Sequence, residues 1–247
     1  MILRRLRLLA FLFPLLLLAV RPVDACACSI PVVGQWPGLR IGLEVPSSPR
    51  WAHDLVLNAS EAWNLAQLWF QENYSPGANV YSFFDSPVGN VTISFAIPAA
   101  FTSIAVGWTE YVLRASSTIL SAHVFLDGSI FNATEAPNVT MQEYGFRIVL
   151  HELGRVLGLG SVMDGLDIMD PIQTLTSASV PPLISLIDLF ALHVLASTPS
   201  PPSAGITLNT DQSFFLNAWN ITGLPFGEQS HNGLKVCMNH DDRFTGC

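Results

Sequence analysis

The chain has 247 residues, of which 50% are apolar and 12% charged, and its formal net charge is −8. This amount of apolar sequence can bury one substantial core, so the composition predicts one globular domain with an extension. The low content of basic residues excludes the positive surface that nucleic acids and anionic membranes attract. Neither is therefore expected as a partner.

Residues 1–27 are predicted to be an export signal, with cleavage near 25–27. A basic start precedes an unbroken apolar run over 8–20, and the small residues Ala25 and Ala27 follow, as in a secretory signal peptide. The run is shorter than the roughly twenty residues of a bilayer span. An uncleaved N-terminal anchor is the alternative. The protein is expected to be secreted or at the cell surface, with no membrane span apart from this signal.

Two further features fit export. Six Asn-x-Ser/Thr triplets are candidate glycosylation sites, at Asn58, Asn73, Asn90, Asn132, Asn138 and Asn220. The cysteines lie near the two ends of the chain, at Cys26, Cys28, Cys237 and Cys247. In an oxidising compartment they are candidates for disulfides that tie the termini together, and free, inert thiols are the alternative. The sequence leaves their pairing open.

The hydrophobic pattern predicts helices and strands along the chain. From Pro49 to about Phe70 the apolar residues recur at helical spacing, which predicts a long amphipathic helix. Runs rich in β-branched or aromatic residues, separated by Pro, Gly, Ser or Asn, predict strands at 40–45, 80–84, 91–97, 104–113 and 118–126. These strands are expected to form one twisted sheet.

A second helix is predicted to begin with a capping box formed by Thr140 and Glu143, and to end at Gly158 in a left-handed conformation. A third helix is predicted over 181–196. The fold class is therefore α+β, with helices packed on one sheet. The expected organisation is a domain over 28–196, followed by a Pro/Ser-rich linker and a small cysteine-containing extension over 197–247.

The second predicted helix carries the residues that suggest a function. Zinc peptidases of one type have the pattern H-E-x-x-H-x-x-G-x-x-H, in which three histidines hold zinc and the glutamate polarises the zinc-bound water. Here His151, Glu152 and Gly158 occupy their places in that pattern. Arg155 and Ser161 stand at the other two ligand positions.

A methionine turn extends the match. Met169 lies eight residues after Ser161, within Ile168-Met169-Asp170-Pro171. With the order of helices and strands, these residues resemble the metzincin zinc peptidases, most closely the matrixin-like group, over about 40–196. The resemblance implies a zinc metalloendopeptidase with an active-site helix, a turn containing Met169 and Pro171 beneath the metal, and a C-terminal helix. It also implies His151 as a zinc ligand and Glu152 as the general base.

The two substitutions argue against catalysis. The Arg155 guanidinium stays protonated and has no lone pair to donate, and the Ser161 hydroxyl is a poor zinc ligand. One imidazole cannot hold a catalytic zinc, so zinc binding is predicted to be weak or absent. Arg155 is expected either to pair with Glu152, one turn away on the helix, or to point out of the cleft into water.

Other residues could complete a metal site. His123 lies in a predicted strand, and Asp164 and Asp167 lie in the loop after Ser161. A strand histidine is more often a hydrogen-bonded structural residue, and Asp164 beside Gly165 is typical of a turn. With these residues as ligands, the chain would be an active metalloendopeptidase that uses Glu152 as the base.

Three functions are consistent with the sequence. A catalytically degenerate, exported homologue could keep its cleft and bind a peptide or protein by strand addition. An active peptidase with a non-standard ligand set is the second alternative. A structural cell-surface glycoprotein is the third. In each case a monomer is expected.

Overall fold

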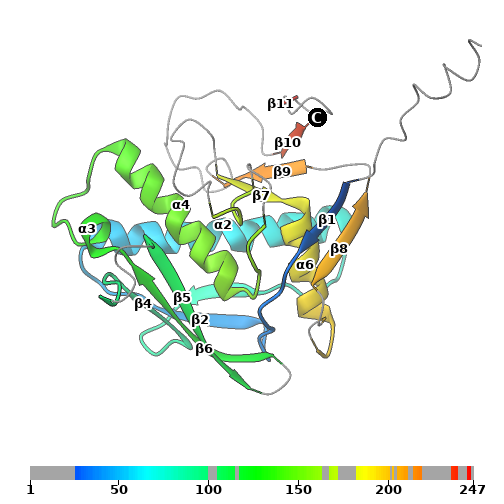
Figure 1. Ribbon diagram of the computed structural model, residues 1–247, viewed down its shortest axis with the longest axis horizontal. Helices are drawn as coiled ribbons and strands as arrows, with labels where there is room; N and C mark the ends of the chain where they lie inside the picture. Colours follow the sequence, from blue (N-terminus) through cyan, green and yellow to red (C-terminus); the bar gives the residue numbers. More distant parts are fainter. Residues whose placement is uncertain are drawn as a thin grey trace, which may run out of the picture.

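The computed structural model describes residues 26–99, 105–114, 117–162, 167–171, 182–200, 202, 205–210, 214–218, 235–238 and 244–245. Within these ranges a mixed five-stranded sheet is packed against helices (Figure 1). The predicted α+β class is confirmed at this level. The predicted export signal over 1–25 lies outside the described residues.

The sheet has the strand order β3-β2-β4-β6-β5. Its strands are β2 (Arg40–Glu44), β3 (Ser82–Asp85), β4 (Val91–Ser94), β5 (Gly107–Arg114) and β6 (Thr118–Leu126). The first four strands in that order pair in parallel, and β5 pairs antiparallel with β6. All five predicted strands are present in this sheet. Strand β5 lies at one end of the strand order.

Strand β4 is shorter than predicted, and a side chain binds the backbone directly after its end. The predicted strand over 91–97 ends at Ser94. The carbonyl of the next residue, Phe95, accepts a hydrogen bond of 2.8 Å from Asn132 Nδ2. Because this carbonyl is bound by a side chain, it does not extend the ladder of the sheet.

Alternation along the strands separates a covered face of the sheet from an outer face. In β6 the residues Ala122, Val124 and Leu126 are buried, whereas His123 and Phe125 point the other way and are half-buried. Helices α2 (Arg50–Tyr74) and α4 (Val139–Val156) lie over the covered face (Figure 1). This face therefore carries the hydrophobic core.

The two long helices are joined by a buried hydrogen bond. Trp63 of α2 is fully buried, and its Nε1 donates to the carbonyl of Leu150 in α4 at 2.8 Å. Helix α2 is about one turn longer than predicted and ends at Tyr74. The short helix α3 (Gly128–Phe131) follows β6 and leads to α4.

The start of α4 corrects the predicted capping box. The N-cap is Asn138, whose side chain accepts from Met141 N at 3.0 Å, and Thr140 is an exposed residue within the first turn. Asparagine is at least as good an N-cap as threonine, so the earlier residue begins the helix. The predicted end is confirmed, because α4 stops at Val156 and Gly158 has φ +99°.

We expect Asn138→Ala to lower the free energy of unfolding by about 1 kcal/mol, because the N–H of Met141 loses its side-chain acceptor and keeps only the backbone carbonyl of residue 138, at 3.1 Å. Thr140→Ala is the matched control, because the threonine hydroxyl caps nothing, and its effect should stay within about 0.5 kcal/mol. Urea unfolding followed by tryptophan fluorescence measures both. A larger loss for Thr140→Ala would restore the capping box that the sequence suggested.

The C-terminal part of the domain also differs from prediction. Helix α6 (Leu186–Ser197) begins five residues later than the helix predicted over 181–196. A capping box formed by Ser185 and Asp188 sets this start. The preceding residues form strand β7 (Leu183–Ser185), which pairs with β9 (Phe214–Asn217). Backbone pairing with β9 thus replaces the first turn of the predicted helix.

Segments beyond residue 197 pair with the domain. Strand β8 (Ile206–Thr210) is antiparallel to β1 (Cys26–Ile30), and β10 (Lys235–Met238) joins β9 to β11 (Phe244–Thr245). These pairings cross the boundary predicted at 196 (Figure 1). Cys26, Cys28 and Cys237 lie on β1 and β10, and Cys247 lies outside the described residues, so the disulfides stay a prediction. Of the helices that are described, none is long and apolar enough to cross a membrane.

Candidate functional site

The site lies where the C-terminal half of α4 meets β5 and the turn after the helix. His151 is buried, and its Nδ1 lies 2.8 Å from the carbonyl oxygen of Ile168. A carbonyl only accepts hydrogen bonds, so Nδ1 donates, and in the neutral ring the lone pair is on Nε2. This is how a second shell orients a metal-binding imidazole. The lone pair of Nε2 is the one that the predicted ligand role of His151 requires.

The turn containing Met169 packs directly beneath α4. A Cβ atom at Gly154 would lie 2.4 Å from Met169 Sδ and 2.8 Å from Trp63 Cζ2. Only glycine allows the helix to approach the turn this closely. Met169 is fully buried and Pro171, which follows the turn, is exposed. The structure thus brings Met169 to the helix that carries His151.

Glu152 faces strand β5. Its Oε2 accepts a hydrogen bond from Thr109 Oγ1 at 2.5 Å, and the carboxylate is almost fully buried. A Cβ atom at Gly107 would lie 2.9 Å from Glu152 Cγ and Oε1, so the strand can pass the carboxylate only because residue 107 is glycine. Thr109 and Gly107 were not predicted from the sequence to belong to the site. Their positions two residues apart in a strand place them on one face, but nothing in the sequence linked that face to α4.

Arg155 and Ser161, which stand at the two substituted ligand positions, bind each other. Arg155 Nη1 donates to Ser161 Oγ at 3.1 Å, and both side chains are half-buried. Of the two alternatives predicted for Arg155, the ion pair with Glu152 is wrong. In the described part of the chain no carboxylate lies within ion-pair distance of the guanidinium. Glu152 is turned toward Thr109, whereas Arg155 is turned toward the segment after the helix.

Tyr111 connects β5 to the end of α4. Its hydroxyl donates to the carbonyl oxygen of Arg155 at 2.8 Å. Burial raises the pKa of Tyr111 well above its usual range, the nearby Arg155 guanidinium opposes the rise, and the Glu152 carboxylate adds to it. Tyr111 therefore remains a neutral hydrogen-bond donor at physiological pH.

His123, one of the substitute ligands proposed from the sequence, is not brought to His151. His123 lies on the outer face of the sheet, where its Nε2 is 2.7 Å from Ser94 Oγ and its ring stacks on Phe125. Thr109 pairs with Val124 and faces α4, so the neighbouring His123 points to the opposite side. Burial lowers the pKa of His123, and Glu110 opposes this shift. Asp164 lies outside the described residues.

The residues at the three ligand positions do not fit zinc. They supply one imidazole nitrogen, a guanidinium without a lone pair, and a neutral hydroxyl that accepts a hydrogen bond from that guanidinium. Among the described residues, no cluster of three or more His, Cys, Asp or Glu side chains could hold a metal ion. By their chemistry, these three side chains offer one nitrogen lone pair where a catalytic zinc needs three protein ligands.

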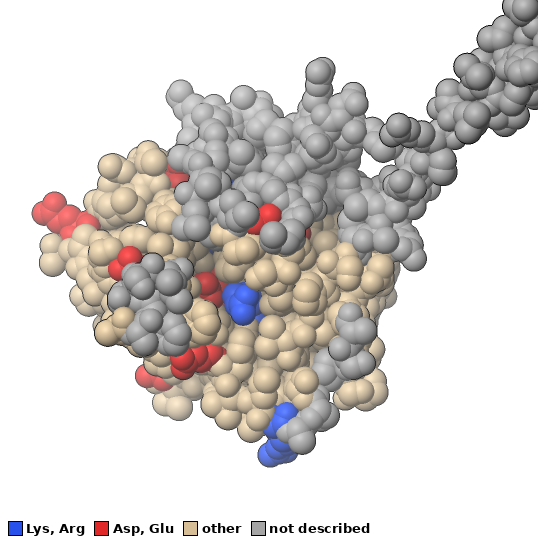
Figure 2. Space-filling view, viewed as in Figure 1, with Lys and Arg blue, Asp and Glu red and all other residues tan. Residues whose placement is uncertain are grey.

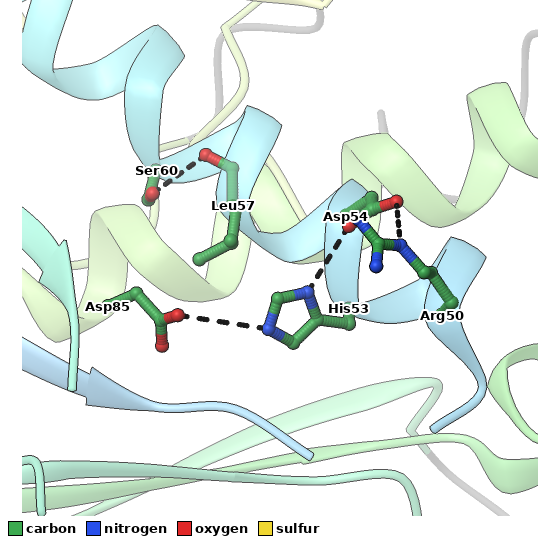
Figure 3. Close-up of polar contacts among 6 residues, drawn as sticks. All are labelled: Arg50, His53, Asp54, Leu57, Ser60 and Asp85. Carbon is green, nitrogen blue, oxygen red and sulfur yellow. Dashed lines mark hydrogen bonds and ion pairs between the residues drawn. The ribbon is translucent and has the colours of Figure 1, made fainter. Parts of the chain in front are cut away.

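A second polar cluster lies far from the site in the fold. Figure 3 shows His53 of α2 between Asp54 (Nδ1 to Oδ1, 3.3 Å) and Asp85 at the end of β3 (Nε2 to Oδ2, 3.9 Å). Arg50 also contacts Asp54, at 3.3 Å, but its side chain is 87% exposed. Exposed pairs of this kind contribute at most about 1 kcal/mol. We assign this cluster to anchoring α2 on the sheet.

Comparison with known proteins adds little. No protein-family model matches the chain, and no curated protein does. A solved structure described as the GM1-bound form of the ECX AB5 holotoxin is similar, with 13% sequence identity and a TM-score of 0.30. The similarity covers 54% of this chain and 61% of that chain, less than two thirds of its length. A likeness this distant supports no conclusion about this protein.

Proposed function

We propose that this protein is an exported, matrixin-like metallopeptidase homologue that has lost its zinc site and binds an extended peptide without cleaving it. The order of helices and strands supports the metzincin-like part of the proposal. So does the packing of Met169 against Gly154 beneath the helix that carries His151. His151 and Glu152 are then the remnants of the catalytic set.

The observation that carries the proposal is the hydrogen bond from Arg155 Nη1 to Ser161 Oγ. A permanent cation stands where the family has a zinc ligand, and it is bound to the residue at the third ligand position. Electrostatic repulsion of a dication and the absence of a lone pair act in the same direction. Glu152 consequently has no zinc-bound water to activate.

The peptide-binding part of the proposal rests on β5. In the described part of the sheet, β5 has a strand neighbour on one side only, namely β6. An extended peptide can add to such an edge through backbone hydrogen bonds. Because Thr109 and Tyr111 connect β5 to Glu152 and Arg155, a peptide on this edge passes over the former catalytic residues.

Metal analysis tests the loss of zinc. We expect the purified wild-type chain to contain far less than one zinc per molecule after equilibration with zinc and buffer exchange. The double variant Arg155→His, Ser161→His restores two imidazoles beside His151 and should bind about one zinc. Arg114→His, at the exposed end of β5, is the matched control and should bind none. One zinc in the wild type, removed by His151→Ala, would refute the proposal.

Peptide binding and cleavage are tested together. We expect a library of N-acetylated hexapeptides to be partly retained by the wild-type protein during ultrafiltration, and to be recovered with intact masses. Cleavage that a chelator abolishes would show the active peptidase instead. Retention of no peptide at millimolar concentration would refute the binding function.

A further inference from the structure

We infer that the edge of β5 selects peptides bearing a carboxylate and that Arg155 is the residue that binds it. This inference rests on the proposed function, because it names the class of peptide that the edge of β5 would hold. It concerns the guanidinium of Arg155, for which the zinc-peptidase pattern provides no role.

The guanidinium of Arg155 retains hydrogen-bonding capacity. Of its five N–H donors, one is used by Ser161 Oγ at 3.1 Å. No carboxylate among the described residues is within ion-pair distance, although the chain as a whole is acidic, with a net charge of −8. Asp164, three residues after Ser161, lies outside the described residues. Among the described ones the guanidinium is left without a counter-charge, and a carboxylate of a ligand would supply it.

The neighbours of Arg155 hold it in place rather than neutralise it. Tyr111 donates to its backbone carbonyl, and Ser161 accepts from one end of the guanidinium. Glu152, the nearest acidic residue on the same helix, is buried and turned to Thr109. Ser161 thus uses one end of the planar fork, and the other N–H groups have no carboxylate acceptor among the described residues; a carboxylate of a ligand could bind them bidentately.

The position of Arg155 fits a ligand that lies along β5. Figure 2 shows one small blue area near the middle of the molecular face, with red acidic atoms beside it and farther to its left. Because Tyr111 of β5 contacts residue 155 directly, a strand added to β5 brings its own side chains or its C-terminus next to the guanidinium. The shared chemistry is a carboxylate, from either an acidic side chain or the C-terminal end.

The test uses hexapeptide libraries with the intact wild-type protein. One N-acetylated library has free C-terminal carboxylates, the second is the same library as C-terminal amides, and the third is an amide library without Asp and Glu. We expect the third library to be retained at least tenfold less than the first, because a charge-assisted bidentate pair is lost. Retention of the second library shows whether side-chain carboxylates suffice.

Variants assign the effect to Arg155. Arg155→Gln should reduce the tenfold preference to about one, and Arg155→Lys should keep only part of it, because an ammonium cannot bind bidentately. Arg114→Gln is the matched control on β5 and should keep the full preference. Equal retention of all libraries by the wild type would overturn the carboxylate inference and leave the peptide-binding function standing. Retention of none, or cleavage, would overturn the proposed function itself.

Two further readouts keep a misfolded variant from being misread. Circular dichroism and the urea midpoint show whether each variant folds. The ratio between libraries in the wild type needs no variant at all, so its value alone supports or refutes selection for a carboxylate.

Discussion

Replacing Gly158 with alanine is expected to destabilise the protein by about 3 kcal/mol or more. Gly158 has φ +99°, which L side chains rarely adopt, and a Cβ atom there would lie 2.1 Å from the carbonyl oxygen of Gly34. That contact is with backbone, so rotation of a side chain cannot relieve it. In the variant, the backbone around Gly34 must therefore move away from the end of α4.

The separation has consequences for the site. The N–H of Val33 donates to the carbonyl of Gly158 at 2.8 Å, and the N–H of Gly160 donates to the carbonyl of Pro31 at 2.7 Å. These bonds hold the segment that leads from Arg155 to Ser161. We therefore expect Gly158→Ala to disturb the hydrogen bond between these two side chains as well as the global stability.

Gly77→Ala is the matched control for this prediction. Gly77 also has a positive φ, +81°, but a Cβ atom there would meet nothing within 4 Å. Its cost should be the backbone strain alone, about 1–2 kcal/mol. Urea unfolding of both variants gives the comparison. Equal losses at the two positions would show that the contact with Gly34 contributes nothing.

Replacing Asp188 with asparagine is expected to remove a large part of the pH dependence of stability. Asp188 is fully buried at the start of α6. Burial raises its pKa well above the usual value, and the charge of Asp167 together with a hydrogen bond to it raises the pKa further. Bonds from Ser185 oppose the rise. The folded protein thus keeps a proton on Asp188 at pH values where the unfolded chain has lost it.

The sign of the effect follows from this difference in bound protons. The contribution of protonated Asp188 is fully present below about pH 4, the pKa of an unfolded aspartate, and is lost as pH rises through the raised pKa. The free energy of unfolding should fall in that window by up to about 1.4 kcal/mol per pH unit. Asparagine donates its N–H to Asp167 at every pH, so Asp188→Asn should flatten the profile and be more stable than wild type at pH 7.

Urea unfolding from pH 3 to pH 8 measures this effect. Glu135→Gln, which removes an exposed carboxyl, is the control and should leave the profile of the wild type unchanged. Parallel profiles for wild type and Asp188→Asn would show that Asp188 does not keep its proton in the folded protein. The result also bears on the site, because Asp167 accepts from Met169 N at 2.7 Å and so positions the turn beneath α4.

The sequence predicted the elements of the fold well where the signal was local. Apolar spacing identified α2 and α4, alternating strands were found within a few residues, and Gly158 ended its helix as expected. The helix starts were less accurate. At α4 and α6 the choice among neighbouring Asn, Ser and Thr residues depends on which one can reach an N–H, and that depends on how the preceding chain enters the helix.

For the site, the sequence by itself determined which chemistry is missing. Arg155 and Ser161 cannot bind zinc as histidines do, whatever surrounds them, because the numbers of lone pairs and charges are properties of the side chains. Only the tertiary structure decided where these side chains turn. Glu152 bonds to Thr109 rather than to Arg155, and His123 faces away from His151, because strand β5 packs against α4 and the sheet has two opposite faces. Contacts between residues more than 40 positions apart have no signature in one sequence, since they exist only after the chain is packed.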